Sequence, residues 1–76
     1  MTYREKVVYE AVERVIARRA AAHRFPECAL QSEIRDEIGV PVEDLPDVLA
    51  SLVSSGYLTV HPAQNEQSYY LTDKKP

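Results

Sequence analysis

The spacing of apolar residues changes at Gly56, and this change constrains the fold more than any other feature of the sequence. Before Gly56, apolar residues recur every three or four positions, which is the period of an amphipathic helix. After Gly56 they recur at every second position in segments rich in β-branched and aromatic residues, as in a strand. The sequence therefore predicts helices followed by a β-hairpin, an α+β domain. All of residues 1–76 should form one domain, because so short a chain rarely builds a second core.

Three segments before Gly56 carry the helical period. We expect helices over residues 3–23, 31–38 and 44–55. Thr2 and Glu5 have the spacing of a capping box, which marks the start of the first helix. Gly39 and Gly56 are suited to the left-handed position that ends the second and third helices, and Asp44 or a neighbouring residue is the expected N-cap of the third.

The hairpin is predicted from two short segments. We expect strands over residues 57–61 and 68–72, joined by a polar turn, with residues 74–76 as a frayed tail. An isolated hairpin is unstable in water, so one side of it must pack on the helices. The apolar side chains expected on that side are Leu58, Val60, Tyr69 and Leu71.

The composition argues against catalysis and against a metal site. Cys28 is the only cysteine, so no intramolecular disulfide can form, and we expect it to be a small buried residue at the start of the second helix. His23 and His61 are far apart in sequence and lack the spacing of metal ligands. Neither glycine belongs to a phosphate-binding loop, so we expect no enzyme and no cofactor. No apolar run approaches the length of a membrane span, and a cytosolic protein is expected.

The charge is unevenly distributed along the chain. The net charge is −3. Residues 1–24 carry six basic against three acidic groups, whereas residues 25–56 carry seven acids against Arg35 alone. The net charge is thus +3 for residues 1–24, which include the first helix, and −6 for residues 25–56. Arg14 and Arg18 lie one turn apart on this helix, where they either balance Glu10 and Glu13 on a solvated face or contact a phosphate or an acidic partner.

The order helix, helix, turn, helix, hairpin resembles that of the winged helix-turn-helix family. Leu30–Val40 resembles the second helix and turn of that family, and Leu49–Leu58 is similar to its third helix running into the first strand of the wing. Tyr70-Leu71-Thr72 resembles the closing strand. The resemblance covers residues 3–73. It implies a DNA-binding or transcription-regulating domain whose third helix enters the major groove while the hairpin touches the backbone or minor groove.

The resemblance also implies which residues would meet DNA. On the third helix they are Asp47, Ala50, Ser51 and Ser54; at the hairpin tip they are Gln64, Asn65 and Gln67; and as backbone contacts they are Arg14, Arg18, Lys74 and Lys75.

The charge of the third helix opposes this DNA-binding mode. Its outward positions include Glu43, Asp44 and Asp47 and no basic residue, although phosphate contacts supply most non-specific affinity for DNA. Capping and the helix dipole account for two of these acids. The alternative is a protein-interaction module of the same fold, which would use the acidic third helix or the long first helix to bind a protein partner or a second copy.

Overall fold

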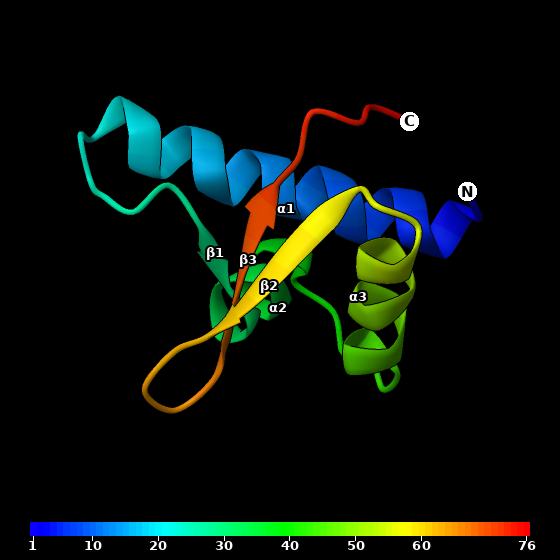
Figure 1. Ribbon diagram of the computed structural model, residues 1–76. Coiled ribbons are helices and arrows are strands. Elements are labelled where there is room, and N and C mark those ends of the chain that lie inside the picture. Colours follow the sequence, from blue (N-terminus) through cyan, green and yellow to red (C-terminus); the bar gives the residue numbers. More distant parts are fainter.

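A computed structural model describes all residues from Met1 to Pro76. Its elements are α1 (Tyr3–Ala21), β1 (Ala29–Leu30), α2 (Gln31–Ile38), α3 (Leu45–Ser54), β2 (Leu58–Pro62) and β3 (Gln67–Leu71). The three strands form one antiparallel sheet in the order β1-β3-β2 (Figure 1). The predicted α+β class is confirmed, with three helices and one antiparallel sheet.

The first helix begins as predicted and ends slightly earlier. The hydroxyl of Thr2 accepts a hydrogen bond from the Glu5 N–H, and the Glu5 carboxylate accepts one from the Thr2 N–H, so the capping box is confirmed. α1 ends at Ala21 rather than at residue 23, because His23 adopts a left-handed backbone (φ 55°).

The second helix has the predicted bounds, and the third is one residue shorter at each end. Gly39 ends α2 with φ of 80°, and Gly56 follows α3 with φ of 87°, so both glycines occupy the expected left-handed conformation. Asp44 stands at the N-cap position of α3, but its side chain does not cap the helix. Its carboxylate instead pairs with the Arg4 guanidinium at 2.6 Å, so that part of the prediction is wrong.

A third strand, β1, was not predicted. Ala29 pairs with Tyr69 and Leu30 with Ser68, so β1 extends the hairpin into a three-stranded sheet. Two residues are too few to show the alternation that identifies a strand. Cys28 is buried as expected, but it precedes β1 rather than starting α2.

The hairpin strands are each displaced by one residue from the predicted ranges. Leu58 pairs with Leu71 and Val60 with Tyr69, so all four side chains share one face of the sheet. Leu58 and Tyr69 are buried and Leu71 is partly buried in the core, as predicted. Val60 is 38% exposed, which contradicts the prediction, because it lies on the outermost strand beyond the helices that cover Leu58.

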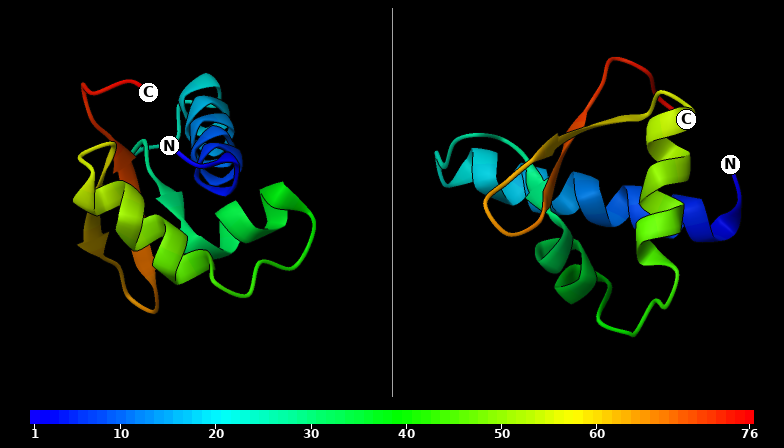
Figure 2. Two further views of the ribbon diagram at one scale, coloured as in Figure 1. Left: turned by 90° about the vertical axis from the view of Figure 1, so that its right-hand side faces the viewer. Right: turned by 60° about the horizontal axis from the view of Figure 1, so that its bottom comes forward.

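The core lies between the sheet and the three helices (Figure 2). α1 contributes one buried stripe, which includes Val8, Val12 and Ile16, and α3 contributes another, which includes Leu49 and Leu52. Tyr9 is buried among them and meets the ring of Tyr57 edge-on, with 6.0 Å between the ring centroids. No helix of the structure is both long and apolar enough to cross a membrane.

Candidate functional site

The outward face of α3 is open along its whole length. Its buried stripe consists of Leu45, Val48, Leu49 and Leu52. Asp47, Ala50, Ser51 and Ser54 lie on the opposite side, and all four are exposed. The side chains predicted to face a partner therefore do face solvent, and three of them are small.

The first turn of α1 borders this face. The Ser51 hydroxyl donates to Glu5 Oε2 at 2.8 Å, and Arg4 pairs with Asp44 at the start of α3. The pKa of Glu5 is lowered, first by the Thr2 N–H and then by the Ser51 hydroxyl, which both donate to the ionised carboxylate. Arg4 thus neutralises the charge of Asp44, one of the acids for which the sequence suggested no basic partner on the third helix.

The hairpin loop contacts the start of α2 rather than α3. Gln64, Asn65 and Gln67 are exposed, and their side chains make no hydrogen bond within the domain. Glu66, between them, accepts hydrogen bonds from the N–H and the hydroxyl of Ser32 at 2.8 and 3.1 Å, which fastens the loop to the start of α2. In Figure 1 the loop lies at the lower left of the domain and α3 at its right. The structure therefore does not bring the two predicted groups together.

Three arginines of α1 are paired with two glutamates of α2. Arg14 and Arg18 both bind the carboxylate of Glu37, Arg14 through Nε at 2.7 Å, and Arg19 binds Glu33 at 2.6 Å. Glu10 and Glu13 make no ion pair, so the direct partner of Arg14 and Arg18 is an acid of α2. The pairing partners could not be found from sequence, because the packing of α1 on α2 decides them.

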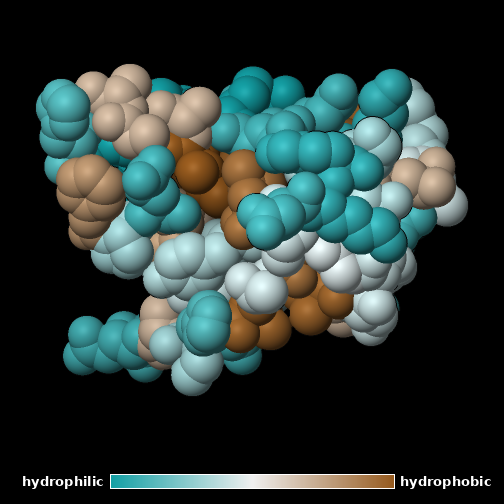
Figure 3. All heavy atoms as spheres, turned by 45° about the horizontal axis from the view of Figure 1, so that its top comes forward, coloured by the Kyte–Doolittle hydropathy of each residue, from teal (hydrophilic) through white to brown (hydrophobic).

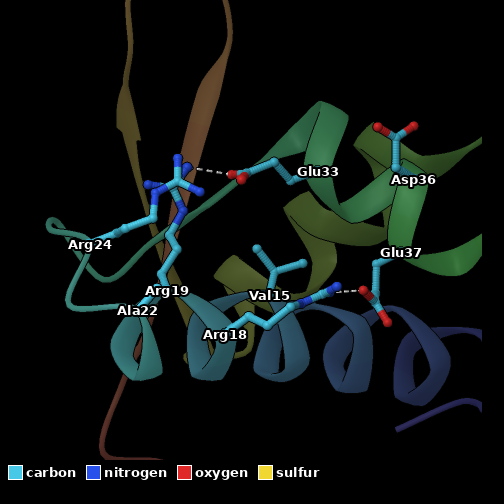
Figure 4. A pocket seen from close by; sticks show the side chains of 8 residues that line it. All are labelled: Val15, Arg18, Arg19, Ala22, Arg24, Glu33, Asp36 and Glu37. Carbon is cyan, nitrogen blue, oxygen red and sulfur yellow. Dashed lines mark hydrogen bonds and ion pairs between the residues drawn. The ribbon is translucent and has the colours of Figure 1, made fainter.

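These pairs line a shallow pocket between α1 and α2 of about 430 Å³ (Figure 4). Its charged residues are Arg18, Arg19, Arg24, Glu33, Asp36 and Glu37, so three positive charges face three negative ones. Burial raises the pKa of Glu33, but hydrogen bonds from the Leu30 N–H and the Arg19 guanidinium outweigh it, and the net shift is downward. The charges of this pocket are balanced, and the ion pairs of Glu33 and Glu37 join the two helices, so the pocket offers no excess charge to a ligand.

The Lys74 side chain also makes contacts within the domain. Its Nζ donates to the carbonyl oxygen of Ser55 at 2.7 Å and lies 4.6 Å from the centre of the Tyr57 ring. Its N–H donates to the Thr72 hydroxyl, so the segment expected to be frayed is fastened at this residue. Lys75, in contrast, is exposed and makes no ion pair.

Exposed apolar side chains occur at scattered positions. The large ones are Met1, Tyr3, Phe25, Val40 and Val60. On the face drawn in Figure 3, the hydrophobic areas are small and separated by hydrophilic side chains. Of these residues, Tyr3 is 84% exposed and lies beside Asp47 and Ser51 in a shallow surface depression.

The open face of α3 offers hydroxyls, a carboxylate and small side chains. No group of three or more His, Cys, Asp or Glu side chains is close enough together to hold a metal ion. Comparison with known proteins finds no match among family models, curated proteins or solved structures.

Proposed function

We propose that this chain is a winged helix-turn-helix domain of the DNA-binding, transcription-regulating type. The order of elements supports this proposal, because α2 is followed by a short connection, then by α3, and then directly by the β2–β3 hairpin. The observation that carries it is the uncovered outward face of α3. A helix can read DNA only if such a face is free to enter the major groove.

The chemistry of this face is compatible with a groove but poor in phosphate contacts. Ser54 can bond to base edges, the Ser51 hydroxyl, which donates to Glu5, can still accept a hydrogen bond, and Ala50 leaves room for close approach. The amides of Gln64 and Asn65 offer similar bonds at the hairpin loop. Arg14, Arg18 and Lys74, expected to bind phosphates, are already bound within the domain, as described above. The exposed basic side chains with neither an ion pair nor a side-chain hydrogen bond are Lys6, Arg24, Arg35 and Lys75.

A second candidate function is a protein-interaction module of the same fold. Glu43 and Asp47 are exposed acids at the start of α3 that make no ion pair, and the exposed ring of Tyr3 lies next to Asp47. Carboxylates beside an aromatic ring fit a basic peptide, which would pair with the acids and pack on the ring. The charge of α3 favours this candidate, and the order of elements favours the first.

Charge reversal at Asp47 separates the two candidates. We would titrate the domain with a labelled random-sequence duplex at about 50 mM salt and repeat the titration at higher salt. If DNA meets α3, Asp47→Lys strengthens binding, and the affinity of both proteins falls steeply with salt. If a basic peptide is the ligand, the same substitution abolishes its binding.

Glu10→Lys is the matched control for this experiment. Glu10 is exposed, makes no ion pair and lies on α1, so its reversal changes the net charge equally without altering α3. An equal effect of both variants would mean that only net charge matters. Absence of duplex binding by the unmodified domain at about 50 mM salt would contradict the DNA-binding proposal.

A further inference from the structure

The sheet has one unpaired edge, the outer side of β2. β2 has β3 as its only neighbour, and the left panel of Figure 2 shows it at the margin of the sheet. Its residues Thr59, Val60, His61 and Pro62 are all exposed. An open edge offers backbone N–H and C=O groups that a further strand can pair with.

The register of the hairpin identifies which backbone groups face this edge. The Ala63 N–H donates to the Glu66 carbonyl at 2.8 Å, directly beyond the pairing of Pro62 with Gln67. In an antiparallel pair, hydrogen-bonded positions alternate along the strand, so Thr59 and His61 bond to β3 while Val60 does not. The N–H and C=O of Val60 therefore point away from β3. Pro62, which has no N–H, falls on the same outward-pointing set, as this alternation requires.

The open edge also lacks the usual protection against pairing. Strand edges are commonly blocked by charged side chains, especially lysine, by bulges or by proline. β2 has the sequence Leu-Thr-Val-His-Pro, which carries no lysine, arginine or carboxylate. Proline stands only at its end, and Val60, at its centre, is an exposed apolar residue.

We propose that β2 pairs antiparallel with β2 of a second copy of this chain, about a two-fold axis at Val60. In this register the two Val60 residues exchange both of their free backbone hydrogen bonds, and the N–H of Leu58 in each copy meets the carbonyl of Pro62 in the other. The two exposed valine side chains come together across the axis. Because the strand carries no formal charge at neutral pH, no like charges oppose one another. The result is a continuous six-stranded sheet, and this inference does not depend on the proposed function.

Few groups take part in this contact, so the dimer should be weak and should form only at high protein concentration. We would measure mass by sedimentation equilibrium from about 1 µM to about 1 mM, the range of weak complexes. Val60→Pro removes the outward N–H but spares the bonds between β2 and β3, which do not involve it. This variant should raise the dissociation constant of the dimer at least about tenfold. Val60→Thr, which keeps the N–H and the branched shape, should dimerise nearly as well as the unmodified chain.

Hydrogen exchange tests the position of the contact. The amide of Val60 should become protected as the protein concentration rises, whereas those of Thr59 and His61 should be protected at every concentration. A chain that stays monomeric at about 1 mM overturns the proposal and leaves the edge open to a different occupant. A dimer in which Val60 exchange does not depend on concentration also overturns it. If Val60→Pro fails to fold, Val60→Lys is the variant to test, because it places two like charges at the two-fold axis. Val60→Lys should raise the dissociation constant by a similar factor, and by less at high salt, where the repulsion is screened.

Discussion

Glu37 holds two arginines of another helix with one carboxylate. Arg14 and Arg18 both bind it, and its side chain is 18% exposed whereas theirs are 53% and 67% exposed. Exposed ion pairs contribute little individually, but Glu37→Gln also leaves two like charges one turn apart on α1. We expect this substitution to lower the free energy of unfolding by about 1 kcal/mol.

Urea denaturation at neutral pH measures this effect. Asp36→Asn is the matched control, because Asp36 is exposed, makes no ion pair and lies next to Glu37 on α2. Equal stability of the two variants would show that the shared carboxylate contributes nothing to folding.

Glu33 makes the stability depend on pH. Burial opposes its ionisation, but the Leu30 N–H and the Arg19 guanidinium outweigh that effect, and the pKa of Glu33 in the folded chain lies below its ordinary value of 4.5. The folded state then binds fewer protons than the unfolded state, so this contribution is complete above pH 4.5 and is lost as the pH falls through the lowered pKa. Thermal unfolding from pH 7 downward should show a smaller loss of stability below pH 4.5 for Glu33→Gln than for the unmodified chain. Parallel curves would contradict the assignment.

At the scale of elements, the hairpin loop caps the second helix. The residue preceding α2, Leu30, has no oxygen in its side chain, so the free N–H groups of the helix need other acceptors. Glu33 accepts from the Leu30 N–H at 3.0 Å, and Glu66 reaches across from the loop to the N–H of Ser32. Because Glu66 is also negatively charged at a helix N-terminus, it stabilises α2 through the helix dipole.

Removal of this cap should weaken α2 and release the loop. We expect Glu66→Ala to lower the free energy of unfolding by about 1 kcal/mol, as for the loss of other N-caps. Amide exchange at Ser32 should accelerate together with exchange in the loop. Gln64→Ala, which alters an exposed side chain of the same loop without a hydrogen bond, should change stability by less than about 0.5 kcal/mol. The interpretation fails if the two alanine variants behave alike.

The elements differ in how far the sequence predicts them. α1, α2 and α3 could be placed to within two residues, because their capping residues and glycines act locally and their apolar period is long enough to recognise. β1 could not be placed, since Ala29 and Leu30 form a strand only by pairing with β3. The outward side of α3 followed from the helical period. The partners of Asp44, Arg18 and Glu66 could not be predicted in this way. Each partner lies on a different element from the residue that it binds, and only tertiary packing brings the two together.

For the whole molecule, folding brings the basic and acidic parts of the chain together. Each of the four ion pairs joins a residue of 1–24 to one of 25–56: Arg4 to Asp44, Arg14 and Arg18 to Glu37, and Arg19 to Glu33. The opposite charges of the +3 segment and the −6 segment thus largely pair with one another within the molecule. The arginines in these pairs are therefore less available to an external anion than the sequence alone suggests.

Salt should therefore destabilise the folded chain. The Debye screening length falls from about 30 Å at 0.01 M salt to about 3 Å at 1 M, so the attraction between exposed ion pairs weakens across this range. If the four pairs together contribute about 1–2 kcal/mol, the melting temperature should fall by roughly 5 °C or more in sodium chloride. The triple variant Arg14→Gln, Arg18→Gln and Glu37→Gln lacks two of the pairs and should show a smaller fall. A melting temperature that is unchanged or raised by salt in the unmodified chain would mean that repulsion among its remaining acids, rather than attraction between the two segments, dominates its electrostatics.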